Sequence, residues 1–298
     1  MDTTYVCNLC PRECNADRGL GKIGFCKVPN HIKVARAALH FWEEPCISGE
    51  EGSGTVFFSG CNLRCVYCQN REIAEGVYGK EITVDRLAAI FLELQEKGAN
   101  NINLVTPSHY VPEIIKALDL AKKQGLSIPV VYNSSAYEKV DTLRKLEGYV
   151  EIYLPDFKYM DETLSRRYSN APDYSNIAKK AIAEMFRQVG KPEFNEKGLL
   201  QKGMVVRHLV LPQCMTDSKK IIEYLYTNYG DDIYISIMNQ YTPLPELEGY
   251  PEINRKLTEE EYEEVVDFAV ELGLENGFIQ EGDVADESFI PKFDGQGV

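Results

Sequence analysis

The sequence has few basic residues for its length and no long apolar segment. Lysine and arginine total 32 against 46 aspartates and glutamates, a formal net charge of −14. This balance argues against nucleic-acid and anionic-membrane binding, which both need clustered cations. No run approaches the ~18 consecutive apolar residues that a membrane-spanning helix requires. Residues 1–6 show neither a basic flank nor the apolar core of a signal peptide. We therefore expect a cytoplasmic protein that binds neither nucleic acid nor membrane.

The sequence also lacks internal repeats and low-complexity segments, and its 44% of hydrophobic residues is ordinary for a globular chain. Cysteine, in contrast, is abundant, with nine residues. An odd number cannot form a fully paired disulfide framework, and cytoplasmic thiols are usually reduced. The cysteines therefore predict metal binding before disulfides.

Three cysteines stand close together within the stretch 60–70. Cys61, Cys65 and Cys68 have C-x3-C-x2-C spacing and directly follow the apolar run 55–58. Cysteine thiolates are the usual protein ligands of iron–sulfur clusters. A cubane of four irons normally takes four protein ligands, so three thiolates leave one iron open to a small molecule. Zinc sites usually show two separated C-x2-C pairs, so we interpret the triplet as an iron–sulfur site.

Four further cysteines, Cys7, Cys10, Cys14 and Cys26, have C-x2-C-x3-C-x11-C spacing. The segment around them is too short to bury much apolar surface, and a metal commonly stabilises such segments. Four thiolates complete a coordination sphere, so this second metal site would be structural or an electron relay. Zinc and a second iron–sulfur cluster both fit, and we favour zinc because C-x2-C is a common zinc half-site. Free thiols are the remaining alternative.

Short apolar runs alternate with amphipathic helical patterns from residue 51 to about 280. This alternation is typical of βαβ units and a parallel sheet in an α/β fold. Strands are predicted at 55–58, 101–106, 129–133, 150–156, 204–211 and 233–238, and helices near 84–97, 112–124, 138–146, 176–189, 218–229 and 258–272. Residues 1–50 are expected to form a cysteine-rich extension. Its stretch 38–49 holds the only tryptophan and is expected to pack an aromatic side chain against the barrel edge; a lid or substrate wall beside the cluster is the alternative. Residues 281–298 are expected to form a tail docked on the body.

The cysteine triplet resembles the signature of the radical S-adenosylmethionine (SAM) superfamily. The opening C-x-L-C-P-R-x-C at 7–14 is similar to that of a group within it that resembles the pyruvate formate-lyase activating enzymes. The resemblance implies an open (β/α)6 partial TIM barrel, a 4Fe-4S cluster and SAM bound at the open iron. It further implies reductive cleavage of SAM to a 5′-deoxyadenosyl radical that abstracts hydrogen. The implied partners are a reductant such as flavodoxin or ferredoxin and a protein substrate such as a glycyl-radical enzyme.

Active groups in such folds collect at the carboxyl ends of the strands. The second predicted strand ends in a Thr-Pro-Ser-His turn, where the superfamily usually has a G-G-E turn that binds SAM. Thr106 and Ser108 are therefore candidate cofactor contacts. His109 is a candidate for proton transfer, since histidine titrates near neutrality, or else a hydrogen-bonded structural residue. Asn133 and Ser134 follow the third strand, and the resemblance implies contacts with SAM.

Two charged residues, Asp156 and Lys158, end the fourth predicted strand and project to the same side of an extended chain. They resemble the D-L-K motif of glycyl-radical activating enzymes, which contacts SAM; a surface ion pair is the alternative. On the fifth strand, Arg207 matches an arginine that contacts the carboxylate of SAM, which would turn His208 toward the helices.

Two further candidates lie beyond the fifth and sixth strands. Cys214 is a candidate hydrogen-atom donor or an ordinary core thiol, and Gln240 is a candidate on the substrate side.

Two other functional classes stay open from the sequence. A non-catalytic iron–sulfur electron-transfer protein would need a fourth thiolate, for which Cys46 and Cys214 are the spare cysteines. A zinc-stabilised binding module would have no redox chemistry.

Overall fold

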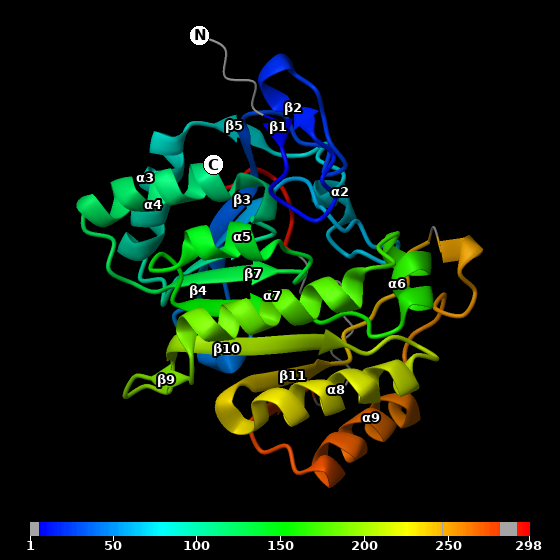
Figure 1. Cartoon of the computed structure of the whole chain (residues 1–298). Coiled ribbons are helices and arrows are strands. Elements are labelled where there is room, and N and C mark those ends of the chain that lie inside the picture. The colour runs from blue at the N-terminus through cyan, green and yellow to red at the C-terminus, as the bar shows by residue number, and fades with distance from the viewer. Residues whose placement is uncertain (1–5, 246, 281–290) are drawn as a thin grey trace.

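The computed structural model describes residues 6–245, 247–280 and 291–298. Within these residues the main sheet has ten strands, in the order β12-β11-β10-β8-β7-β6-β4-β3-β5, with β9 beside β10. Figure 1 shows this sheet with the longer helices packed along it. None of the described helices has the length and apolar character needed to cross a membrane.

The bounds of the elements follow the chain order. The strands of the main sheet are β3 (Ile32–His40), β4 (Ser53–Phe58), β5 (Lys80–Ile82), β6 (Ile102–Val105), β7 (Val130–Ser134), β8 (Ile152–Pro155), β9 (Glu193–Phe194), β10 (Leu200–Leu209), β11 (Tyr234–Met238) and β12 (Gly277–Ile279). The α-helices are α1 (Pro45–Ser48), α2 (Arg71–Ala74), α3 (Val84–Glu96), α4 (Val111–Lys123), α5 (Val140–Leu143), α6 (Glu162–Ser169), α7 (Tyr174–Val189), α8 (Met215–Tyr229) and α9 (Glu259–Leu272).

The six predicted strands correspond to β4, β6, β7, β8, β10 and β11, and neighbours among them pair in parallel. Helices connect successive strands, because parallel neighbours need a crossover. The sheet runs from β12 at one end to β5 at the other without closing. The predicted open α/β barrel is therefore confirmed; its sheet also contains β3, β5, β9 and β12, and helices α1, α2 and α6 were not predicted either.

Alternate side chains along each strand point to opposite faces of the sheet. Tyr132 and Val206 belong to the large core that the strands share with the helices. Val131 and Val205 belong to a smaller cluster inside the barrel. Near-continuous apolar strands are expected where both faces are covered.

The cysteine-rich extension does not reach residue 50. Strand β3 pairs antiparallel with β4 from Val34–Phe58 to His40–Ser53 and so belongs to the main sheet. The N-terminal cysteines precede it, around a separate hairpin of β1 (Val6–Cys7) and β2 (Ala16–Asp17). We call residues 6–28 the cysteine module; Figure 1 shows its hairpin outside the main sheet.

Residues 41–49 enter the barrel instead of packing an aromatic on its outer edge. Trp42 is 61% exposed, so most of the indole surface is not buried against the body. Cys46 and Ile47 of α1 are buried against Val131 and Leu154 of the barrel interior. Small and aliphatic side chains of this segment therefore fill the barrel, and the larger indole stays outside.

The last eight residues pack along β3. Gly295 N–H donates to Ala35 O at 3.1 Å, and Ala37 N–H donates to Gln296 O at 2.9 Å. The ring of Phe293 meets a ring of β4 edge-on at 5.5 Å. Residues 291–298 thus lie against the body, whereas 281–290 fall outside the described residues.

Candidate active site

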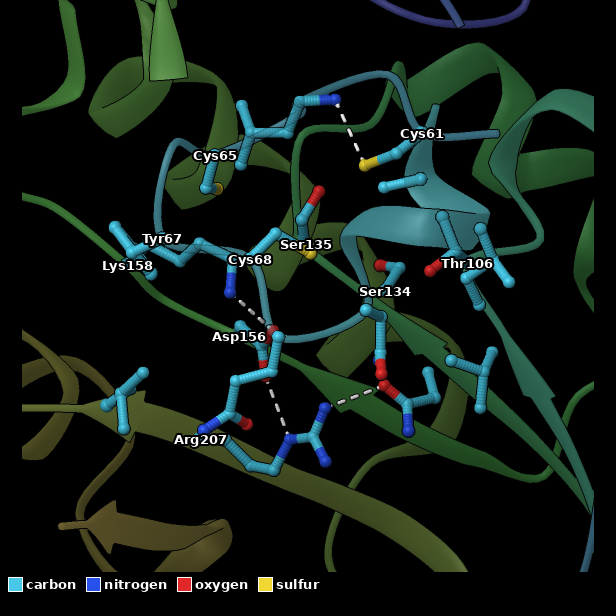
Figure 2. A pocket seen from close by; sticks show the side chains of 18 of the residues that line it. Cys61, Cys65, Tyr67, Cys68, Thr106, Ser134, Ser135, Asp156, Lys158 and Arg207 are labelled. Atoms are coloured by element: carbon cyan, nitrogen blue, oxygen red, sulfur yellow. Dashed lines mark hydrogen bonds and ion pairs between the residues drawn. The ribbon is translucent and has the colours of Figure 1, made fainter. Parts of the chain in front are cut away.

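A cavity of about 230 Å³ opens at the carboxyl ends of the parallel strands. Figure 2 shows the three clustered cysteines toward its upper part and Arg207 in its lower part. The predicted site residues that line it are Cys61, Cys65, Cys68, Thr106, Asn133, Ser134, Asp156, Lys158, Arg207 and Gln240. The strands therefore gather side chains that lie far apart in the sequence.

The loop after β4 holds the three cysteines, and we call residues 59–70 the cluster loop. Gly60 has a φ of +89°, and a Cβ there would lie 2.6 Å from the carbonyl oxygen of Cys26. Glycine is the residue that tolerates both the positive φ and this close approach. The backbone N–H groups of Leu63 and Arg64 donate to Cys61 Sγ at 3.3 and 3.4 Å. These N–H groups favour the thiolate form of Cys61.

The donor set fits an iron–sulfur cluster held by three thiolates. Burial raises the pKa of Cys68 to about 12 and also raises the pKa of Cys61, so a cation is needed to keep these sulfurs ionised. No three Cys, His, Asp or Glu side chains among the described residues converge on one ion. Cys61, Cys65 and Cys68 do share the lining of one cavity, where their thiolates could hold a cluster.

The described cavity lining contains these three cysteines and no other, and it contains no histidine. Cys46 lies in the barrel interior, and Cys214 is buried outside the lining. Neither spare cysteine supplies the fourth thiolate that a non-catalytic electron carrier would need. The open coordination position predicted from the triplet is thus compatible with the cavity.

Arg207 joins the charged residues of the lining into one network. Its Nε donates to Asp156 at 2.8 Å, its Nη1 to Glu43 at 3.0 Å and its Nη2 to Asn133 at 2.7 Å. Lys158 Nζ lies 2.8 Å from the second oxygen of Asp156. Burial alone would raise the pKa of Asp156, but the two cations outweigh it and hold that pKa below its usual range. The network therefore stays charged inside the barrel.

Sequence reasoning missed Glu43, which reaches the network from the segment that fills the barrel. Its second oxygen accepts hydrogen bonds from Asn103 at 3.1 Å and Asn133 at 3.4 Å. Burial raises the pKa of Glu43, and the Arg207 guanidinium opposes that rise. The available signal was two consecutive acids, Glu43 and Glu44, directly before a proline within an otherwise apolar stretch.

Three predicted residues lie away from the cavity. The Ser108 hydroxyl donates to Glu138, and His109 Nε2 bonds the carbonyl of Ser59 at 2.8 Å. Burial lowers the pKa of His109 to about 3, so this ring is neutral and suits a structural role better than proton transfer. Cys214 occupies the N-cap position of α8, where burial raises the pKa of its thiol to about 12. In the turn after β6, Thr106 lines the cavity, whereas the side chains of Ser108 and His109 are directed into the core.

An aromatic cluster behind the cluster loop was also missed. Tyr67 is 5% exposed, and its hydroxyl is hydrogen-bonded to that of Tyr159 at 2.7 Å. Tyr159 also bonds Ser169 at 2.8 Å, and the Ser169 hydroxyl donates to Cys65 Sγ at 3.0 Å. Buried tyrosines with satisfied hydroxyls give a rigid support for one ligand sulfur.

In the cysteine module, Cys7, Cys10 and Cys26 are buried and Cys14 is exposed. Arg18 Nη2 donates to Cys26 Sγ at 3.2 Å. These sulfurs also do not converge on one ion among the described residues. The arrangement of these sulfurs in the structure therefore gives no support to the preference for zinc over an iron–sulfur cluster.

Comparison with known proteins agrees with this geometry. The family model described as the Radical SAM superfamily matches residues 55–209. The uncharacterized protein MJ0674 of Methanocaldococcus jannaschii is 30% identical over 280 residues, which cover 90% of this chain and 75% of that protein. The pyruvate formate-lyase-activating enzyme of Clostridium pasteurianum is 29% identical over 179 residues, covering 57% of this chain and 66% of that enzyme.

Solved structures show weaker likeness. SuiB of Streptococcus suis, bound to the precursor peptide SuiA, has a TM-score of 0.48 and 16% identity over 75% of this chain and 47% of SuiB. The methylornithine synthase PylB has a TM-score of 0.49 and 14% identity over 70% of this chain and 59% of PylB. The matched part is thus about half the length of these two proteins. By the family match and the sequence relatives, this chain is an enzyme that belongs to the radical SAM superfamily and is similar to pyruvate formate-lyase-activating enzymes.

Proposed function

We propose that the chain binds a 4Fe-4S cluster through Cys61, Cys65 and Cys68, cleaves SAM reductively and abstracts hydrogen from a substrate. Superfamily membership implies the cluster and SAM as cofactors. One observation carries the residue assignment: the three thiols share a cavity with the Arg207 network, and the described lining has no fourth cysteine or histidine. When bound, the cluster supplies the electron that splits the sulfonium C–S bond of SAM and gives a 5′-deoxyadenosyl radical.

The residues of the chain would bind and orient the polar parts of SAM. Thr106, Asn133 and Ser134 present hydroxyl and amide groups to the cavity. Lys158 keeps its proton, because Asp156 outweighs the effect of burial and raises its pKa. Apolar side chains complete the lining and would limit the access of water to a reactive radical; they include Val105, Leu209 and Met238.

Anaerobic reconstitution with iron and sulfide tests this function. We expect about four irons at the Cys61 site, a spectral change when SAM is added to the reduced protein, and 5′-deoxyadenosine as a product. Cys65→Ser should abolish both the spectral change and the product. Cys46→Ser, a buried cysteine away from the cavity, is the matched control and should behave as the wild type. A wild-type protein that binds iron but shows no response to SAM would support an electron carrier instead.

The cysteine module is proposed as a second metal centre, either zinc or an iron–sulfur cluster. The C-x2-C-x3-C-x11-C spacing of its four cysteines supports this, and three of them, Cys7, Cys10 and Cys26, are buried. Quantifying both metals decides the identity. About four irons with one zinc per chain indicates zinc, whereas about eight irons indicates a second cluster. About four irons without zinc would contradict a second centre.

A glycyl-radical enzyme is the proposed substrate class, with a small carrier such as flavodoxin or ferredoxin as the reductant. The relative from Clostridium pasteurianum supports this class, because its name describes activation of pyruvate formate-lyase. Incubation of the reduced protein with SAM and a candidate glycyl-radical enzyme should give a glycyl-radical signal in electron paramagnetic resonance (EPR). Production of 5′-deoxyadenosine without that signal, across the candidates, would point to another substrate.

A further inference from the structure

We propose that Arg12 is a positioning residue that holds the cluster loop in its ligand geometry. The proposal rests on the cluster assignment of the preceding section and adds a role for the cysteine module. Arg12 stands between Cys10 and Cys14 in the sequence and lies outside the cavity lining. It therefore acts through the backbone of other residues and not by contact with a cofactor.

The Arg12 guanidinium donates to four backbone carbonyls from two segments. Nε donates to Asn62 O at 2.8 Å and Nη2 to Leu63 O at 3.5 Å, both in the cluster loop. Nη2 also donates to Ser169 O at 2.9 Å, and Nη1 donates to Asn170 O at 2.5 Å, at the end of α6. A planar fork with five N–H donors suits this arrangement, whereas a lysine ammonium is a compact point charge.

Each segment that Arg12 holds leads directly to a ligand sulfur. Asn62 follows Cys61, whose Sγ accepts from the N–H of Leu63 at 3.3 Å. The Ser169 hydroxyl donates to Cys65 Sγ at 3.0 Å. One guanidinium therefore fixes the backbone beside one ligand and the hydrogen-bond donor of another. Partners of this kind orient metal ligands and tune the metal that they hold.

Stacking restricts the guanidinium further. Its central carbon lies 3.9 Å from the ring centroid of Phe25 and 5.0 Å from that of Tyr137. Phe25 precedes Cys26, whose carbonyl packs on Gly60 at the start of the cluster loop. The cysteine module thus meets the cluster loop at two places, through the Arg12 guanidinium and through the Cys26 carbonyl.

The test compares Arg12→Lys and Arg12→Ala with the wild type after anaerobic reconstitution. Arg166→Ala is the matched control, because Arg166 lies on α6, is exposed and pairs with Glu162 on the same helix. Circular dichroism checks the fold of each variant. The readouts are the rate at which cluster iron is lost to a chelator, and the EPR spectrum of the reduced cluster with and without SAM.

We expect both Arg12 variants to lose cluster iron about tenfold faster than the wild type, since charge-assisted hydrogen bonds are lost. Their EPR spectra should be broader and respond less to SAM, and Arg166→Ala should match the wild type. If Arg12→Ala does not fold, the comparison with Arg12→Lys decides. Wild-type rates and spectra in a folded Arg12 variant would overturn this inference. A wild-type protein that takes up no cluster would overturn the proposed function instead.

Discussion

At the scale of single residues, burial and pairing decide what a charged side chain can do. The family resemblance implies that Arg207 contacts the carboxylate of SAM. In the structure each of its three nitrogens already donates to Asp156, Glu43 or Asn133. Of the five N–H donors of a guanidinium, two are left for a ligand. Arg207 therefore holds the floor of the cavity together in addition to any contact with the cofactor.

Arg207→Met should lower the free energy of unfolding by about 3 kcal/mol, because it leaves buried carboxylates without their cation. Adding Glu43→Gln should recover part of this loss, since it removes one of the unpaired charges. Urea denaturation of the single and double variants measures both effects. Strictly additive losses would contradict a direct coupling between Arg207 and Glu43.

His208, which faces the helices as expected, should make stability depend on pH. Burial lowers its pKa from 6.5 to about 4, and its ring bonds Phe157 O and Ser218 Oγ, both at 2.8 Å. The unfolded chain takes up this proton below pH 6.5, but the folded chain does so only near pH 4. The contribution of the neutral His208 ring to the stability of the folded chain is therefore present above pH 6.5 and is lost as pH falls toward 4.

Between pH 6.5 and pH 4 the contribution of His208 to the free energy of unfolding falls by an amount on the order of 3 kcal/mol. His208→Asn should reduce stability at pH 7 but flatten its decline in acid, as measured by urea denaturation at pH 7, 5.5 and 4. His31→Asn, at an exposed position, is the control and should keep the wild-type profile. An unchanged acid decline in His208→Asn would show that other groups cause it.

At the scale of elements, helices with a clear hydrophobic periodicity were predictable, whereas elements without an apolar face, or defined by pairing with a distant strand, were not. Helices α3, α4, α7, α8 and α9 begin and end within a few residues of their predicted bounds. Helix α6 was missed because its sequence, ETLSRRYS, has almost no apolar face. Strand β3 was missed because it was assigned to the cysteine-rich extension, whereas its pairing with β4 is a tertiary contact.

The start of α9 is defined by a reciprocal pair of hydrogen bonds. Thr258 Oγ1 accepts from Glu261 N–H, and the Glu261 carboxylate accepts from Thr258 N–H, both at 3.2 Å. Thr258→Ala should lower the free energy of unfolding by about 1 kcal/mol. Thr227→Ala, at an exposed position within α8, is the control and should be neutral or slightly stabilising. Equal stability of both variants in urea would contradict the capping role.

At the scale of the whole molecule, both ends of the described chain pack near the cavity. Phe293 packs with Phe57, Ile73 and Val105, and the last two also line the cavity. The last eight residues therefore support one wall of the site from the side of β3. The cysteine module, at the N-terminal end of the described chain, supports the cluster loop through the hydrogen bonds of Arg12.

Phe293→Ala should lower the free energy of unfolding by about 2 kcal/mol, because a partly buried ring leaves its contacts. It should also weaken the spectral response to SAM, since the cavity wall loses support. Gln296→Ala, an exposed side chain on the same segment, is the control for both measurements. A normal SAM response in a destabilised Phe293→Ala protein would limit the segment to a stabilising role.

The order of βαβ units and the cysteine triplet could be predicted before folding was considered, because hydrophobic periodicity and ligand spacing are local properties. Long-range packing brings Glu43 to Arg207, across 164 residues, and lets Arg12 join the cluster loop to the end of α6, across 50 and 158 residues. It also turned Ser108, His109 and Cys214 away from the cavity. Such contacts depend on which faces the strands and turns present after packing, and no local pattern encodes that.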